Sequence, residues 1–474
     1  MAREHVFSVA SPTLRFGKEH ALDTQVFALA ERAPAVRKKL WEDLWEDLWE
    51  ACWQDVCGAC WLWARNRQEC PITPNSTMPS YAYLIVGGGM TAAAAVAGIR
   101  EADHEGTIGV ISSEAHPPYD RPPLSKALWK GDPLDSIWRN VDGNRTTSHS
   151  GRTVRSLDIG KREIIDDKST AYTYDKLLLA TGCAPRRLPF GGDQILYFRT
   201  VDDYERLRAM TERGNRFAII GGGFIGSELA ASLTSIGKEV VMVFPDAGIG
   251  SRMHPPDLAN YLTGLYRENG VEVLAGATVT DCEQRDGKSV LKVKLDQTEG
   301  EREVAVDGVV AGIGAEPNVE LARAAGLTVD NGIRVDSSLR TSDSRIYAAG
   351  DVASYHDPSL NMWRRVEHAD NANTMGGFAG VAMSGRAVSY DHLPFFYSDF
   401  FELGYEAVGE VDSRLQMVAD WKVPFREGVI YYLRDGHVRG VMLWNLWGQV
   451  DAARRLIGSS DSFRGAELKG RLPE

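Results

Sequence analysis

Two glycine-rich turns, each between a short apolar strand and a helix, constrain the fold of this chain more than any other feature. The first follows the apolar stretch 81–86 and places Gly87, Gly89 and Ala92 in a G-x-G-x-x-A pattern. The first glycine permits a tight turn, the second lets the backbone approach a pyrophosphate, and the small third residue lets helix and strand pack closely. Glu114 ends the next strand, where a carboxylate accepts hydrogen bonds from ribose hydroxyls. The pattern therefore predicts a dinucleotide site.

The second turn follows the predicted strand 216–220 and repeats the pattern with Gly221, Gly223 and Gly226. The helix that begins there presents free N–H groups to a pyrophosphate. Asp246 stands 20 residues past Gly226, and a carboxylate at that place repels a 2′-phosphate. We therefore expect NAD to be preferred over NADP, with Arg252 close enough to weaken the preference.

The rest of the chain after residue 80 alternates short apolar runs with helical patterns, which predicts an α/β class with parallel sheets. From about Leu393 the chain is rich in aromatic residues and strand-like runs. The runs 429–433 and 438–444 flank Arg434-Asp435-Gly436-His437, which is a hairpin signal. We expect two Rossmann-like dinucleotide-binding domains followed by a C-terminal α+β domain.

Residues 1–77 differ in composition from the rest and are expected to be an atypical extension of the protein. Tryptophans recur at every fourth position from Trp41 to Trp53. This indicates either an amphipathic docking helix or, as we favour, a tandem repeat without a role. Cys57 and Cys60 form a C-x-x-C, but no second pair supports a zinc or redox site. Since Met78 directly precedes the first strand, we expect residues 1–77 to be dispensable.

The overall composition argues against several classes of partner. A net charge of −12 disfavours binding to nucleic acid. There is no run of 18 apolar residues, so no membrane span is expected. We see no signal peptide, and the body beyond residue 77 contains only two cysteines, Cys183 and Cys282, which suits a reducing compartment. These features predict a cytoplasmic protein, and no metal site is expected.

A third element is the strand 344–349, which ends in Gly350-Asp351. Asp351 would either accept a hydrogen bond from the ribityl chain of a flavin or cap the following helix. Together with Ala180-Thr181-Gly182 and the strand end 312–318, the three elements resemble the FAD-dependent pyridine nucleotide-disulfide reductase superfamily. The redox cysteine pair of its disulfide reductases is missing.

The stretch 119–126, Tyr-Asp-Arg-Pro-Pro-Leu-Ser-Lys, is instead similar to ferredoxin reductases and to flavoproteins of the apoptosis-inducing-factor type. The C-terminal stretches 364–368, 397–399, 404–409 and 440–445 resemble the latter group. One departure is Tyr397, which stands where that family has a nicotinamide-stacking tryptophan. The long acidic insertion of the animal proteins and a mitochondrial presequence are not evident, so a prokaryotic relative is expected rather than an apoptotic effector.

The resemblance implies FAD at the first turn and NAD at the second. It divides the body into an FAD-binding domain in two parts, 78–195 and 319–392, an NAD-binding domain, 196–318, and the C-terminal domain, 393–474. The turns and the resemblance assign the following residues to FAD: Gly87, Gly89, Ala92, Glu114, Arg121, Lys126, Ala180, Gly182, Asp351, Glu367 and His368. Those assigned to NAD are Gly221, Gly223, Phe224, Ile225, Gly226, Asp246, Arg252, Gly314, Tyr397 and Glu406.

Lys126, Glu228 and His368 are the expected catalytic residues. The resemblance places Lys126 beside the flavin and pairs it with Glu228, because either charge would be costly to bury alone; the alternative is a solvated helix lysine. His368 and Glu367 would meet the flavin–nicotinamide face, although a lone histidine is as often structural. Phe224 would cover the nicotinamide or simply pack in the core.

The implied function is an FAD-dependent NADH oxidoreductase that transfers hydride from NADH to the flavin. Electrons then leave to an external acceptor such as a quinone, a ferredoxin or oxygen. Two alternatives stay open: a reductase dedicated to ferredoxin or rubredoxin, and a redox-sensing dimer with little turnover. In the proteins that the chain resembles, NADH promotes formation of a homodimer.

Overall fold

The computed structural model describes residues 78–472, apart from 142, 144 and 297–299. The predictions made for residues 1–77, including the tryptophan repeat, the C-x-x-C pair and their dispensability, lie outside these residues. Residues Met78–Glu474 form one compact unit. No helix in the described part of the chain is long and apolar enough to cross a membrane.

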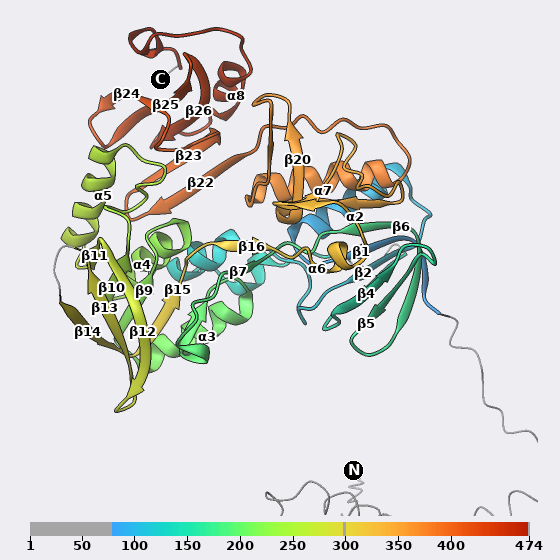
Figure 1. Ribbon diagram of the computed structural model, residues 1–474, viewed down its shortest axis with the longest axis horizontal. Coiled ribbons are helices and arrows are strands. Elements are labelled where there is room, and N and C mark those ends of the chain that lie inside the picture. Colours follow the sequence, from blue (N-terminus) through green and yellow to red (C-terminus); the bar gives the residue numbers. More distant parts are fainter. Residues whose placement is uncertain (1–77, 142, 144, 297–299, 473–474) are drawn as a thin grey trace, which may run out of the picture. The chain divides into compact units, whose positions relative to one another are not determined.

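The first glycine turn follows strand β1 of a seven-stranded sheet (Figure 1). Its order is β3-β2-β1-β6-β5-β4, and β19 pairs with β6. The strands are β1 (Ser80–Val86), β2 (Ile108–Ile111), β3 (Thr146–His149), β4 (Val154–Asp158), β5 (Glu163–Asp166), β6 (Ala171–Leu179) and β19 (Ile346–Ala348). Because β19 lies beyond the second glycine turn in sequence, two separate stretches of chain build this sheet.

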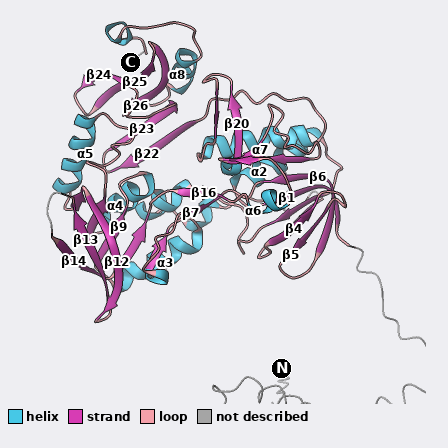
Figure 2. Cartoon of the chain, in the orientation of Figure 1, coloured by secondary structure: helices cyan, strands magenta, loops and turns pink. Residues whose placement is uncertain are grey.

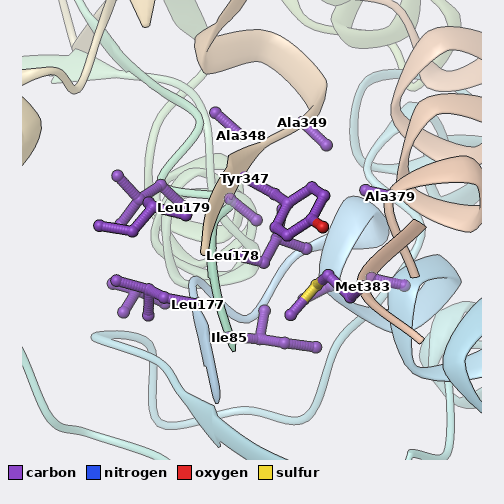
Figure 3. Packing of buried hydrophobic residues seen from close by; sticks show 14 of the residues in the cluster. Ile85, Leu177, Leu178, Leu179, Tyr347, Ala348, Ala349, Ala379 and Met383 are labelled. Carbon is purple, nitrogen blue, oxygen red and sulfur yellow. The ribbon is translucent and has the colours of Figure 1, made fainter. Parts of the chain in front are cut away.

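Two helices, α2 (Met90–Ala102) and α7 (Ala369–Met383), lie side by side against the sheet (Figure 1). They can approach closely because Gly98 has no side chain. A Cβ at this position would lie only 2.2 Å from the carbonyl oxygen of Gly377. Figure 3 shows Met383 and Ala379 of α7 next to Tyr347, with Ile85 and Leu178 of the sheet nearby. The core beneath the first turn therefore joins residues more than 250 positions apart.

The second glycine turn belongs to a parallel sheet of order β11-β10-β9-β15-β8. Its strands are β8 (Ile195–Tyr197), β9 (Arg216–Ile220), β10 (Glu239–Phe244), β11 (Glu272–Ala275) and β15 (Gly308–Ala311). The helices of this part are α3 (Val201–Arg213), α4 (Phe224–Ser235) and α5 (Pro256–Glu268). An antiparallel sheet of β12 (Ala277–Arg285), β13 (Lys288–Leu295) and β14 (Glu301–Val306) completes it.

Short elements connect these parts. The segments entering and leaving the second sheet pair as β7 (Cys183–Pro185) and β16 (Ala315–Pro317), and α6 (Glu320–Ala324) follows. A small sheet contains β17 (Val329–Asp330), β18 (Gly332–Arg334), β20 (Ala353–Asp357) and β21 (Met362–Arg364). Short 3-10 helices include η1 (Pro122–Ser125), η2 (Ala127–Lys130), η3 (Leu134–Ile137), η4 (Gly192–Gln194), η5 (Gly350–Val352) and η6 (Gly465–Leu468).

The C-terminal part is an antiparallel sheet of order β22-β23-β26-β25-β24 with α8 (Val450–Ile457) beside it (Figure 2). Its strands are β22 (Phe395–Phe400), β23 (Leu403–Gly409), β24 (Gln416–Val423), β25 (Glu427–Arg434) and β26 (His437–Trp444). The expected hairpin is β25–β26, and its turn residues Asp435 and Gly436 both have positive φ. Two positive φ values match the right-handed twist of the paired strands.

Candidate functional site

The first glycine turn leaves open space at the N-terminus of α2. Gly87 has a φ of 126°, and a Cβ there would lie 2.0 Å from the carbonyl oxygen of Ala180. At Gly89, the N-cap of α2, a Cβ would meet only Nη2 of Arg121, at 4.0 Å. Ala92, one turn into α2, is completely buried. Free N–H groups, open space and a guanidinium fit the pyrophosphate of FAD.

Glu114 and Arg121 lie together beside this space. Oε1 of Glu114 accepts a hydrogen bond from Nη2 of Arg121 at 2.5 Å, and Oε2 accepts one from the hydroxyl of Tyr119, also at 2.5 Å. Arg121 also donates to the carbonyl oxygen of Arg199 at 2.9 Å. The carboxylate expected to bind ribose is thus fixed by two donors and keeps acceptor capacity for a ligand.

Asp351 lies in η5, and the 2.6 Å ion pair with Arg199 holds its carboxylate. Arg365 donates hydrogen bonds to the carbonyl oxygen of Asp351 and to Sγ of Cys183, both at 3.0 Å. It also forms an ion pair with Glu367 at 2.6 Å. Burial raises the pKa of Cys183 to about 12, so the thiol stays protonated at neutral pH. Of the other predicted FAD residues, Ala180 faces Gly87, and Gly182 has a φ of 65° with open space at its Cβ position.

The second turn is built in the same way. A Cβ at Gly221 would lie 2.4 Å from the carbonyl oxygen of Gly312, and one at Gly226 would lie 2.1 Å from that of Gly221. At Gly223, the N-cap of α4, a Cβ would meet nothing within 4 Å. Phe224 and Ile225 then form the first turn of α4. This open helix N-terminus fits the pyrophosphate of NAD.

Asp246 follows β10 and forms an ion pair with Arg252 at 3.2 Å. The Arg252 side chain is 79% exposed, so its guanidinium is free to move toward a ligand. The residue expected to repel a 2′-phosphate and the residue expected to attract one thus form an ion pair with each other. Gly314, with a φ of 99°, lies in the segment that leaves this sheet, and only Arg186 is within 4 Å of its Cβ position.

Lys126 and Glu228 form a buried ion pair. Lys126 Nζ lies 2.7 Å from Oε1 of Glu228, with 12% and 3% of the two side chains exposed. Glu228 also accepts hydrogen bonds from the hydroxyls of Ser125, at 2.5 Å, and Ser398, at 2.7 Å. Its carboxylate in α4 thus joins the end of η1 to the C-terminal sheet.

His368 lies in an aromatic cluster with Phe224 and Phe396. Its ring stacks on Phe396 at a centroid distance of 4.3 Å, and Phe224 meets both rings edge-on, at 6.0 Å from His368 and 5.4 Å from Phe396. Burial lowers the pKa of His368 to about 4, so the ring is neutral at physiological pH. The cluster brings together α4, the start of α7 and β22.

Tyr397 and Glu406, both predicted to bind NAD, lie on neighbouring strands of the C-terminal sheet. They are cross-strand partners on β22 and β23, and Tyr397 points to the opposite side of β22 from Phe396. The Tyr397 ring contacts Lys126, with Nζ 5.1 Å from its centroid. Glu406 accepts a hydrogen bond from the N–H of Gly448. Phe396 is therefore the β22 residue that contacts Phe224 and His368.

Tyr397 also lines a cavity of about 330 Å³ between the first glycine turn and the C-terminal sheet. The starts of α2 and α7 border this cavity, at Met90 and Ala369. The other lining residues are Asp120, Pro122, Pro123, Ser136, Asp370, Asn373 and Phe395. Two helix N-termini beside one cavity favour a ligand that carries negative charge or electronegative ring atoms.

Sequence reasoning missed five residues of this site: Ser125, Arg199, Arg365, Phe396 and Ser398. Ser125 and Arg365 lie inside stretches that carry the resemblance, and Phe396 and Ser398 flank Tyr397, but only the neighbouring charged or aromatic residue was assigned a role. No local pattern marks Arg199, because its partner Asp351 is 152 positions away.

Comparisons with known proteins agree with this geometry. Residues 81–376 match the family model described as "Pyridine nucleotide-disulphide oxidoreductase". Residues 420–459 match "Apoptosis-inducing factor, mitochondrion-associated, C-term". The chain is 34% identical to "Apoptosis-inducing factor 1, mitochondrial" of Dictyostelium discoideum, over 80% of this chain and 78% of that protein.

Two further relatives are reductases. The chain is 34% identical to the "Anthranilate 1,2-dioxygenase system ferredoxin--NAD(+) reductase component" of Burkholderia cepacia, over 80% of this chain and 94% of that protein. Among solved structures, the covalent putidaredoxin reductase–putidaredoxin complex matches with a TM-score of 0.75 and 28% identity. The match covers 82% of this chain and 95% of that chain.

Proposed function

The chain belongs to the pyridine nucleotide-disulphide oxidoreductase family, and we propose that it delivers electrons to a small external carrier of the ferredoxin class. It is an FAD-dependent NADH oxidoreductase of the apoptosis-inducing-factor type that passes electrons to an acceptor. Bound FAD supplies the redox chemistry, taking hydride from NADH and releasing electrons. The protein binds, orients and shields the reactants.

The observation that carries the proposal is the exposed edge of the candidate flavin site. Tyr397 is 38% exposed, covers Lys126, and lines the cavity beside the first glycine turn. An acceptor that contacts this face therefore comes close to the Lys126–Glu228 pair without entering the nucleotide site. Relatives named as ferredoxin--NAD(+) reductase and putidaredoxin reductase support the same choice of acceptor.

The described cysteines do not offer an internal route for the electrons. Cys183 lies in β7 and Cys282 in β12, and both are buried free thiols. Burial also raises the pKa of each thiol, which disfavours the thiolate that exchange chemistry needs. Within the described part of the chain, reducing equivalents therefore leave by an external acceptor.

We assign the local roles from the contacts. Glu228, which accepts hydrogen bonds from two serines, keeps the Lys126 ammonium in place at the end of η1, beside the expected flavin. Neutral His368 and Phe396 offer an apolar ring surface, under Phe224, for the nicotinamide. Asp246 favours NADH over NADPH. A cytoplasmic location stays a prediction, and the free thiols of Cys183 and Cys282 suit it.

The test is a two-step rapid-mixing experiment. The protein is reduced anaerobically with one equivalent of NADH and then mixed with a [2Fe–2S] ferredoxin, a soluble quinone or oxygen. We expect reoxidation to be fastest with the ferredoxin and to slow as salt screens the docking charges. Faster reoxidation by quinone or oxygen would overturn the ferredoxin proposal.

A second candidate is an NADH-sensing homodimer with little turnover. The match of residues 420–459 to the apoptosis-inducing-factor C-terminal model favours it. So does the aromatic cluster of Phe224, His368 and Phe396, because stacked rings would retain the nicotinamide. Light scattering during the same NADH titration distinguishes the candidates: a doubling of mass with slow reoxidation by every acceptor supports the sensor.

A further inference from the structure

The loop between β10 and α5, residues 245–255, contacts the second glycine turn. The N–H of Gly250 donates a hydrogen bond to the carbonyl oxygen of Gly222 at 3.0 Å. The same loop carries Asp246 and Arg252, the ion pair that we expect to lie near the adenosine ribose of NAD. One short segment therefore borders both the pyrophosphate turn and the selectivity residues.

The other side of this loop is held by the C-terminal domain. The N–H of Ser413 donates to the carbonyl oxygen of Arg252 at 2.9 Å. The hydroxyl of Tyr432 donates a hydrogen bond to the carbonyl oxygen of Met253 at 2.8 Å. The ring of His254 packs edge-on against Tyr405 and Trp444, each at a centroid distance of 5.6 Å. Three consecutive loop residues are thus fixed by the C-terminal sheet and the segment before β24.

His254 behaves as an apolar wedge in this contact. Only 3% of the residue is exposed, and its Nδ1 is buried without a hydrogen-bond partner among the described residues. Burial lowers the pKa of His254 to about 3, so the ring is neutral. The loop is shaped around it, because Gly250 has a φ of 69° and a Cβ there would lie 2.3 Å from the imidazole.

The loop needs this support because its functional side chains are not fixed by burial. The Asp246 side chain is 33% exposed and that of Arg252 is 79% exposed. Hydrogen bonds from Gly250 N–H to Gly222 and from Ile249 N–H to Thr263 anchor the middle of the loop to the NAD-binding domain. Residues 252–254 are instead held from outside by the C-terminal domain. A contact that orders a binding loop before the ligand arrives lowers the entropic cost of binding.

We propose that His254 and Tyr432 are positioning residues for the nicotinamide nucleotide, through which the C-terminal domain sets NADH affinity and the preference for NADH over NADPH. The inference rests on the assignment of NAD to the second glycine turn. It gives the C-terminal domain a role in nucleotide recognition, although none of its residues near this loop needs to touch the nucleotide.

The test compares two neighbouring tyrosines of β25 in the full-length, FAD-loaded protein. Tyr432→Phe removes the hydroxyl that holds Met253 and keeps the ring. Tyr431→Phe is the matched control, since Tyr431 is equally buried but points to the other side of the sheet. NADH oxidation is followed with ferricyanide, so the result does not depend on the physiological acceptor.

For Tyr432→Phe we expect the KM for NADH to rise about three- to tenfold, the size of one lost hydrogen bond, with kcat unchanged. The ratio of kcat/KM for NADH to that for NADPH should fall, because Asp246 and Arg252 are no longer fixed. Tyr431→Phe should leave both quantities at the wild-type values. His254→Leu, which keeps an apolar side chain of similar size, should act in the same direction as Tyr432→Phe.

Unchanged KM values and cofactor ratios in both Tyr432→Phe and His254→Leu, with normal FAD content, would overturn the proposal. So would a fall in kcat at constant KM, which would indicate a general structural effect. A ferredoxin that fails as acceptor while ferricyanide works contradicts only the proposed acceptor and leaves this inference intact.

Discussion

The Nζ atom of Lys126 lies 2.7 Å from Oε1 of Glu228, and only 3% of the glutamate side chain is exposed. The two residues belong to different parts of the chain, since Lys126 follows η1 and Glu228 lies in α4. A buried ion pair is costly to leave half complete, because the remaining charge has neither water nor a partner. This pair therefore couples the geometry of the flavin site to that of the nicotinamide site.

Glu228→Gln removes the charge and leaves one amide oxygen, so only one of the two serine donors, Ser125 at Oε2 or Ser398 at Oε1, keeps its acceptor. We expect the free energy of unfolding to fall by about 3–5 kcal/mol, because the Lys126 ammonium stays buried without a counter-charge. Flavin reduction by NADH should also slow, as measured by stopped-flow absorbance. The control is Glu402→Gln, since Glu402 pairs with Arg426 on the surface and its loss should cost less than about 1 kcal/mol. Equal losses in both variants would refute the assigned role.

Two alanine substitutions in the first glycine turn should have different consequences. At Gly87 the new Cβ would clash with the backbone of Ala180 at a positive φ, so Gly87→Ala should lower the melting temperature. At Gly89 the Cβ enters open space in front of α2, so Gly89→Ala should fold normally but retain less FAD. Thermal melts of the apoprotein and the flavin absorbance after gel filtration measure the two effects. Full FAD content in Gly89→Ala would contradict the assignment of the pyrophosphate site.

Asp246→Ala should reduce or reverse the preference for NADH over NADPH. The substitution removes the carboxylate that repels a 2′-phosphate and frees Arg252, which pairs with it at 3.2 Å. The ratio of kcat/KM for the two nucleotides in the wild type and the variant measures this. Arg252→Ala is the opposing variant and should strengthen the NADH preference. If the wild type uses both nucleotides equally, the assignment of Asp246 is wrong.

The class of fold could be predicted because local patterns carry it. Each glycine turn is a short contiguous motif with a strand before it and a helix after it, and the β25–β26 hairpin has its own turn signal. Periodicity cannot show which distant strands share a sheet, such as β6 and β19. That pairing depends on tertiary packing and was not predicted; the resemblance implied only that residues 78–195 and 319–392 belong to one FAD-binding domain.

The site was less accessible to sequence reasoning. Each glycine turn lies between a strand and a helix as the pattern predicts, and Lys126 pairs with Glu228 as the resemblance implies. The ligands assigned to the motif residues stay predictions. Tyr397 was expected to cover the nicotinamide together with Phe224, and this stays a prediction; the alternation of side chains along β22 puts Phe396 against Phe224 and Tyr397 against Lys126. One residue of register decides this. The neutral donors Ser125 and Ser398 were missed because their role exists only where three chain segments meet.

The free energy of unfolding should decrease as the pH is lowered, and His254 should account for part of this decrease. Burial lowers the pKa of His254 to about 3, from 6.5 for an unperturbed histidine. Between those values the unfolded chain binds a proton that the folded chain excludes, so stability decreases as the pH falls below about 6.5. This group contributes a loss on the order of 2 kcal/mol between pH 6.5 and pH 5.

Urea unfolding at pH 7 and pH 5 measures that loss. His254→Leu should show a smaller decrease in unfolding free energy over this interval, since it has no buried imidazole to protonate. The exposed residue His104 provides the control, and His104→Gln should keep the wild-type dependence. A wild-type pH dependence in His254→Leu would rule out His254 as its source.

The last prediction concerns how long the nicotinamide stays after it has given up its hydride. Phe396 stacks on His368 and meets Phe224 edge-on, whereas Tyr397 lies across β22, against Lys126. If the cluster retains the nicotinamide, anaerobic NADH addition should produce a long-wavelength charge-transfer absorbance, and Phe396→Ala should weaken this absorbance and speed reoxidation by oxygen. Tyr397→Ala should leave both nearly unchanged but slow transfer to ferredoxin, because it alters the exposed edge. The opposite pattern, with Tyr397→Ala abolishing the absorbance, would show that Tyr397 covers the nicotinamide. The nicotinamide would then have to bind on the Lys126 side of β22.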